Sequence, residues 1–225
     1  SGTSALLLNP DDKVRLVPTQ DFNGSAGSFT FRAWDQTTTG SGSAGSKVDV
    51  STNGGTTEFS SFEETSTITV NSINDGPTIV TTGTSILSGS GTTFTANDQF
   101  TTILEDSGEG SGDAVSTFLN DGSIVDEEGV VTGVAITSVT NTNGDWQFSI
   151  NNGTTFTNFG SVTASTALLL DGGNANHKVR FVPDGDFNGT ATIKYRAWDK
   201  ATGTAGNIAN TSTTGGSTAF SAGEI

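Results

Sequence analysis

The stretch that decides the fold reads Val179-Arg180-Phe181-Val182-Pro183, Asp186-Phe187-Asn188-Gly189 and Tyr195-Arg196-Ala197-Trp198-Asp199. Nearly the same series stands earlier, as Val14-Arg15-Leu16-Val17-Pro18, Asp21-Phe22-Asn23-Gly24 and Phe31-Arg32-Ala33-Trp34-Asp35. The period is about 160 residues, which is far longer than a solenoid unit and close to the size of a whole domain. The sequence therefore predicts a tandem array of domains, in which function depends on repetition more than on one active site.

The repeats are out of phase with the ends of the sequence. Ser4-Ala5-Leu6-Leu7-Leu8 matches Thr166-Ala167-Leu168-Leu169-Leu170, and the first copy continues to Asn74-Asp75-Gly76-Pro77, which the second copy has not reached at Ile225. We expect residues 1–76 to be the C-terminal half of one repeat and residues 77–225 to be nearly all of the next, without its last strand. The 225 residues are then expected to be a window on a longer polypeptide.

Composition narrows the classes of function. A formal net charge of −15 argues against binding to nucleic acid or to an anionic membrane, because both need basic patches. The charge suits a chain that binds divalent cations or one kept soluble by self-repulsion. The absence of cysteine excludes disulfides, thiol catalysis and zinc–thiolate sites, and no apolar run is long enough for membrane insertion.

Alternating apolar and polar residues predict β-strands along most of the chain. The alternation is clearest in residues 28–34, 66–70, 133–139, 146–150 and 179–181, with Asn-Gly turn signals between strands. This pattern is typical of antiparallel sheets with one buried face. The predicted fold class is therefore all-β, with tandem antiparallel β-sandwiches of cadherin or immunoglobulin type.

The repeat also predicts matching positions in the core. Phe31 and Tyr195 should be buried equivalents, because they stand at the same place in the two copies. Residues 77–225 should have an open place for a strand like residues 67–70, and the half-domain at 1–76 should be completed by residues 78–160 of another copy.

The repeated residues resemble those of a known family. Residues 167–170, 179–183, 186–191 and 196–199, together with Asn74-Asp75-Gly76-Pro77 and residues 143–149, resemble the cadherin-like repeats of giant bacterial surface proteins, including RTX-type adhesins and biofilm matrix proteins. The resemblance implies an extracellular β-sandwich array, secreted or held at the cell surface, and often stiffened by Ca²⁺ at domain junctions. Gly76 departs from the family, which more often has Ala, and we expect this departure to matter little.

Acidic residues gather near the predicted boundary. Asn74-Asp75 closes the first repeat, Glu105-Asp106 lies early in the next, and Asp126-Glu127-Glu128 follows. Calcium takes about six to eight oxygen ligands from carboxylates, Asn side chains and backbone carbonyls. The candidate metal ligands are Asp75, Glu105, Asp106, Asp126, Glu127 and Glu128; the alternative is that they are solvated acidic turns.

Two further repeated features have a structural and a functional interpretation. Asp35 and Asp199 either cap a strand end or contact the arginine of the same strand, or else bind a metal. Trp34 and Trp198 either pack on the second face of a sheet or contact a carbohydrate or a partner.

Catalysis has little support in the sequence. His177 is the only histidine, lies in a polar turn and has no counterpart in the first copy. The acidic residues lie in Gly/Asp turns rather than among apolar residues that would raise a carboxyl pKa. We therefore expect this protein not to be an enzyme.

The sequence favours an extracellular structural repeat of a fibrous or surface-anchored protein, which acts as a spacer or as the body of a filament. Its expected partners are other copies of itself. The alternative is a ligand-binding adhesin module that recognises carbohydrate or a surface. Exposed aromatic residues in a concave site would favour the adhesin, and strand pairing between copies would favour the fibre.

Overall fold

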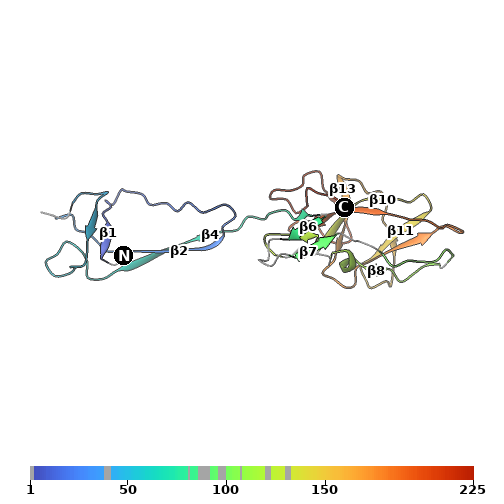
Figure 1. Ribbon diagram of the computed structural model, residues 1–225, viewed down its shortest axis with the longest axis horizontal. Coiled ribbons are helices and arrows are strands. Elements are labelled where there is room, and N and C mark those ends of the chain that lie inside the picture. The colour runs from blue at the N-terminus through green and yellow to red at the C-terminus, as the bar shows by residue number, and fades with distance from the viewer. Residues whose placement is uncertain are drawn as a thin grey trace. The chain divides into compact units, whose positions relative to one another are not determined.

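The computed structural model describes residues 3–37, 42–80, 82–85, 92–95, 100–106, 108–119, 123–129 and 133–225. They form an all-β protein with several antiparallel sheets (Figure 1), divided into two compact units, Ser1–Ser72 (unit 1) and Ile73–Ile225 (unit 2). The boundary expected between residues 76 and 77 concerns the limits of the repeats and stays a prediction. No helix among the described residues has the length and apolar character needed to cross a membrane.

Unit 2 contains two four-stranded antiparallel sheets. The first has the order β15 (Ile193–Trp198), β10 (Gly133–Val139), β13 (Thr166–Asp171), β16 (Ile208–Asn210). The second has the order β12 (Thr157–Asn158), β11 (Gly144–Ser149), β14 (Lys178–Pro183), β8 (Asp113–Ala114). Smaller elements are the pair β5 (Thr78–Ile79) and β9 (Ile124–Val125), the pair β6 (Thr82–Ser85) and β7 (Thr92–Thr95), and a 3₁₀ helix, Val115–Phe118.

The two sheets of unit 2 share one apolar core, as the sheets of a β-sandwich do. The first sheet contributes the buried residues Val134, Ile136, Leu168, Leu170 and Tyr195. The second sheet contributes Trp146 and Val179. The other face of the first sheet carries a second cluster, in which Leu169 packs with Trp198 and Phe220. Because β13 is covered on both faces, its sequence is apolar at four successive positions instead of alternating.

Unit 1 contains two strand pairs. β1 (Ser4–Leu6) pairs with β3 (Lys47–Asp49), and β2 (Gly24–Phe31) pairs with β4 (Glu64–Val70). Its buried core is a small cluster of Leu7, Val50 and Phe59.

The β1–β3 pair of unit 1 repeats the β13–β16 pair of unit 2. Ala5 faces Val48 in the first pair, and Ala167 faces Ala209 in the second, in the same antiparallel register. The turns that follow also match: Gly45 N donates to Leu7 O at 2.8 Å, as Gly206 N donates to Leu169 O at 2.7 Å. The two copies therefore share backbone pairing as well as sequence.

A second part of the framework is duplicated around the repeated Arg-Ala-Trp-Asp motif. Trp34 forms a bridge with Phe59, and Trp198 forms the same bridge with Phe220. Arg32 Nη1 donates to Ser60 O at 3.0 Å, as Arg196 Nη1 donates to Ser221 O at 3.2 Å. Since these bonds are long-range in sequence, they fix the same loop against the same strand in both units.

The prediction that Phe31 is buried is wrong. Phe31 is 46% exposed, whereas its equivalent Tyr195 is 2% exposed. Tyr195 lies in a core that contains residues of β10 and β11, and no counterpart of these two strands occurs in the described residues of unit 1. The alternation predicted for the matching strand β15 is supported, because Tyr195 and Ala197 are buried, but β2 is exposed on both faces and no sheet among the described residues of unit 1 covers it.

Candidate functional site

One end of unit 2 is acidic. Asp126 directly follows β9, and Asp199 directly follows β15. Within the first sheet, Trp198 pairs with Gly133, so the end of β15 lies beside the start of β10. We call Asn74, Asp75, Asp126, Glu127, Glu128 and Asp199 the acidic end.

Hydrogen bonds tie segments far apart in the sequence together at the acidic end. Asn74 Nδ2 donates to Asp199 Oδ2 at 2.8 Å, and the Asp75 backbone N–H donates to Glu128 Oε2 at 3.4 Å. The Glu128 N–H in turn donates to Asp126 Oδ1 at 3.0 Å. The structure therefore brings four of the six candidate metal ligands, Asp75, Asp126, Glu127 and Glu128, to one end, and adds Asn74 and Asp199.

Asp199 also caps the end of its strand, because its Oδ1 accepts a hydrogen bond from Ala201 N at 2.7 Å. Asp35 does the same in unit 1, where its Oδ1 accepts from the Thr37 hydroxyl at 2.6 Å and from Thr37 N at 2.9 Å, and these two bonds lower the Asp35 pKa. The strand-end interpretation of these two aspartates is therefore confirmed.

The Asp126 carboxyl has a strongly altered acidity. Burial, helped by the negative charges of Glu128 and Asp199, raises its pKa to about 6, although the hydrogen bond from the Glu128 N–H lowers it. The expectation that no acid in this chain has a raised pKa is thus wrong. Sequence analysis named Asp126 as a candidate ligand but did not predict its raised pKa, because its burial comes from the packing of unit 2 and not from apolar neighbours in sequence.

The acidic end fits a divalent cation. Asp126 Oδ2 is buried and has no hydrogen-bond partner in the structure, while neighbouring carboxylates repel it. Calcium bound here would find oxygen ligands in Asp126, Glu128 and Asp199 and would neutralise their mutual repulsion. A carboxylate oxygen of Asp75 and one of Glu127 also lie within 4.8 Å of each other, so these two residues are further candidate ligands at the acidic end.

Gly76 is needed where it stands, so the expectation that it matters little is wrong. Its N–H donates to Gly216 O at 2.5 Å. A Cβ at this position would come within 2.7 Å of Thr218 O and 3.1 Å of Gly216 O. The Asn74–Asp75 segment can therefore approach the 216–218 loop this closely only with glycine at position 76.

Glu105 and Asp106, the other two candidate ligands, lie elsewhere. Asp106 Oδ1 accepts from Asp186 N at 3.3 Å, and Glu105 Oε2 accepts from Asn188 Nδ2 at 3.4 Å. Residues 186–188 precede the start of β15, which is the end opposite to Asp199. The acidic residues that the sequence suggested as one group are thus divided between the two ends of unit 2.

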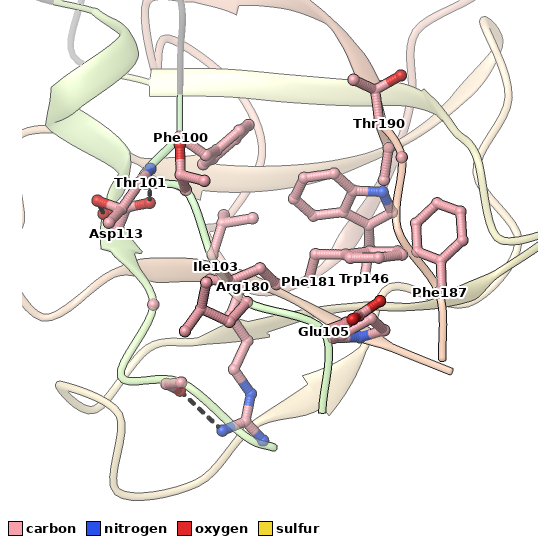
Figure 2. A pocket seen from close by; sticks show the side chains of 18 of the residues that line it. Phe100, Thr101, Ile103, Glu105, Asp113, Trp146, Arg180, Phe181, Phe187 and Thr190 are labelled. Carbon is pink, nitrogen blue, oxygen red and sulfur yellow. Dashed lines mark hydrogen bonds between the residues drawn. The ribbon is translucent and has the colours of Figure 1, made fainter. Parts of the chain in front are cut away.

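A pocket of about 890 Å³ lies beside Glu105 (Figure 2). Its aromatic walls are formed by Phe100, Trp146, Phe181 and Phe187. The ring centroids of Trp146 lie 5.1 Å from Phe100 and 5.2 Å from Phe181. The Trp146 Nε1 is buried without a hydrogen-bond partner.

A short segment closes one side of this pocket. Thr101 is held to β8 by two bonds to Asp113, from its backbone N–H at 2.8 Å and from its hydroxyl at 2.6 Å. Ile103 and Leu104 of the same segment are exposed. Sequence analysis missed this role, because residues 100–105 carry no strand alternation.

Arg180, the cation in the pocket lining, is already fully engaged. Its guanidinium lies 3.8 Å above the Phe156 ring, donates to Gln147 Oε1 at 2.8 Å and pairs with Glu109 at 3.0 Å. Figure 2 shows its further bond to Gly110 O, at 3.1 Å. The pocket therefore offers aromatic faces and hydroxyl groups more readily than a free positive charge, which suits a neutral ligand.

His177 contributes to the structure of unit 2. It is buried, and its Nδ1 accepts a hydrogen bond from Asp171 N at 3.1 Å. Burial lowers its pKa, so the neutral ring is favoured. This bond ties the end of β13 to the start of β14.

No family model, curated protein or solved structure matched this chain. The proposals below rest on the residues and geometry just described.

Proposed function

We propose that this chain is an extracellular structural module, a cadherin- or immunoglobulin-like repeat that serves as a spacer or as the body of a filament. The observation that carries the proposal is the duplicated framework. Both units hold the same strand pairing and the same Arg–loop bonds about 160 residues apart. Selection for one binding site would not require a second copy of these part-buried bonds.

Calcium is part of the proposal. The acidic end holds Asp126, Glu128 and Asp199 close enough for their charges to raise the Asp126 pKa. In a chain with a formal net charge of −15, a divalent cation at this end would remove local repulsion and stiffen the segment that leads into unit 2. This agrees with the secreted or cell-surface location that the resemblance implies, where free calcium is abundant.

The test is the length of arrays. Chains that contain one, two and four joined copies of residues 65–225 would be compared by small-angle scattering and electron microscopy, in calcium and in chelator. The proposal expects particle length to grow in proportion to copy number and bending to increase in chelator. Particles whose length does not grow with copy number would contradict a spacer or filament role.

A second candidate function is supported by the pocket. Aromatic rings that line a concave surface bind sugar rings through their apolar faces, and Phe100, Trp146, Phe181 and Phe187 provide such rings. The Arg180 guanidinium already contacts Phe156 and Glu109 of the same chain, so an uncharged oligosaccharide fits the pocket better than an anionic one. On this proposal the repeat would be an adhesin module that recognises carbohydrate.

A further inference from the structure

Unit 1 exposes an apolar surface whose counterpart in unit 2 is buried. Val14 is 62% exposed and Phe31 46%, whereas their equivalents Val179 and Tyr195 are 0% and 2% exposed. The same contrast separates the pairs Leu6 and Leu168, and Leu8 and Leu170. The four counterparts belong to one core cluster in unit 2, so the exposed apolar side chains of unit 1 indicate an interaction site.

Unit 2 shows what covers this surface. In its first sheet, β10 lies between β13 and β15: Val134 faces Leu170 on one side and Ala197 on the other. In its second sheet, β11 pairs with β14, with Trp146 opposite Phe181. The side chains of these two strands complete the core around Leu168, Leu170, Val179 and Tyr195.

The described residues of unit 1 contain the flanking strand pairs without the strand between them. β1 pairs with β3 in the register of β13 and β16, and β2 pairs with β4. The outer edges of the two frameworks also agree. In unit 1, Phe31 pairs with Glu64, and at the corresponding position of unit 2 Tyr195 and Ile225 exchange backbone hydrogen bonds of 2.9 and 3.0 Å. A strand like β10 is the piece that would join the two pairs into one sheet.

We propose that unit 1 binds an additional copy of the segment 78–160. Its β10-like strand would enter between β2 and β1, antiparallel to both, and its β11-like strand would pair with residues 14–17, as β11 pairs with β14. Backbone hydrogen bonds to two strand edges would provide affinity, and the alternate apolar side chains would provide register. The partner is therefore a polypeptide with the same repeat. This deepens the proposed function by naming what the repeat binds.

The number of copies in the chain decides where the segment comes from. The described structure contains the acceptor framework twice, in residues 3–65 and 165–225, and the covering strands β10 and β11 once. A second identical chain could cover unit 1 only by uncovering its own unit 2, with no net gain in buried area. The segment must therefore come from a polypeptide that carries a further copy.

The test is a chain with a second copy of residues 78–164 joined in front of Thr3. The control carries Val134→Asp and Ile136→Asp in the added copy alone, at positions that are fully buried in unit 2. The measurement is amide hydrogen exchange at Arg32 and Trp34. The backbone N–H groups of these two residues face the edge that would receive the strand. Unit 2 keeps its own segment, so Arg196 and Trp198 report in the same sample that the chain is folded.

Exchange at Arg32 and Trp34 is expected to slow by about tenfold or more in the extended chain, and not in the control. Unchanged exchange in the extended chain, or equal slowing in the control, would overturn the proposal. Slowing that rises with the concentration of the original chain would also overturn it, because unit 1 would then bind itself. None of these failures would change the dependence of array length on copy number, so the proposed function is tested separately.

Discussion

Phe31 and Tyr195 stand at the same position of one framework and have opposite environments. Phe31 pairs with Glu64, and Tyr195 exchanges backbone hydrogen bonds with Ile225 at the corresponding position. Phe31 is nevertheless exposed, whereas Tyr195 is buried. The difference arises because β10 and β11 cover Tyr195 in unit 2. The same backbone thus occurs once with its core covered and once with it open.

This relationship predicts unequal costs for equivalent substitutions. Tyr195→Ala should lower the free energy of unfolding of unit 2 by about 3–5 kcal/mol, because it removes a buried aromatic ring. Phe31→Ala should cost unit 1 about 1 kcal/mol or less, because its ring is already half in solvent. Urea unfolding followed by the NMR signals of Trp198 and Trp34 measures the two separately, and equal costs would contradict the comparison.

A methyl group at position 76 should disturb the acidic end. Gly76→Ala is expected to destabilise unit 2 by about 1–3 kcal/mol, because the new Cβ would lie against the carbonyl oxygens of Thr218 and Gly216. Gly185→Ala is the matched control, since a Cβ there meets no atom within 4 Å. Denaturant midpoints give the comparison, and a neutral Gly76→Ala would show that the segment has room.

Asp126 predicts how stability depends on pH in the absence of divalent cations. Its pKa is raised from 3.8 to about 6 by burial and by its acidic neighbours, so the folded state holds the proton more tightly than the unfolded chain. The resulting stabilisation is complete below about pH 4 and is lost as the pH rises through 6. Thermal unfolding of unit 2 in chelator should show this loss, and Asp126→Asn should remove that part of the dependence; an unaltered profile in the variant would assign it to other groups.

Calcium should reverse this loss. Above pH 6, Ca²⁺ is expected to raise the melting temperature of unit 2 relative to chelator, because it binds the ionised carboxylates of the folded state. Asp126→Asn combined with Asp199→Asn should reduce the effect strongly, whereas Glu105→Gln, at the other end of unit 2, should leave it unchanged. Identical melting curves in calcium and chelator would contradict a calcium site at the acidic end.

The pocket predicts a spectroscopic response to sugars. A neutral oligosaccharide that stacks on the aromatic walls should change the fluorescence of Trp146, and Phe187→Ala should weaken the response about tenfold by removing one wall. Val14→Ala, in unit 1, is the control. A panel of neutral oligosaccharides that leaves the fluorescence and the NMR spectrum unchanged would count against the adhesin function.

Local pattern was sufficient for much of the fold. The strand predicted over residues 133–139 is β10, and the strand expected over 66–70 lies within β4, because both sequences alternate and end at turn residues. The all-β class and antiparallel pairing follow from the same alternation. The specific cadherin or immunoglobulin type depends on connections between strands and stays a proposal.

Long-range contacts set the limits of sequence analysis. The burial of Asp126, the Asn74–Asp199 bond and the need for glycine at position 76 all join segments far apart in the chain. Phe31 shows another limit, since its pattern predicted a strand but could not show whether a second sheet covers that strand. Glu105 and Asp106 lie at the end of unit 2 opposite to Asp199. This placement depends on the packing of loops and not on the spacing of the acidic residues in the sequence.

Unit 1 and residues 165–225 of unit 2 have one framework, which is open in unit 1 and covered in unit 2. Tyr195 bonds outward to Ile225, so the alternate residues Arg196 and Trp198 face β10, and by the same alternation Arg32 and Trp34 face an open edge. Amide hydrogen exchange of the 225-residue chain tests this directly. We predict slow exchange at Arg196 and Trp198 and fast exchange at Arg32 and Trp34, and equal protection of the two pairs would contradict the account.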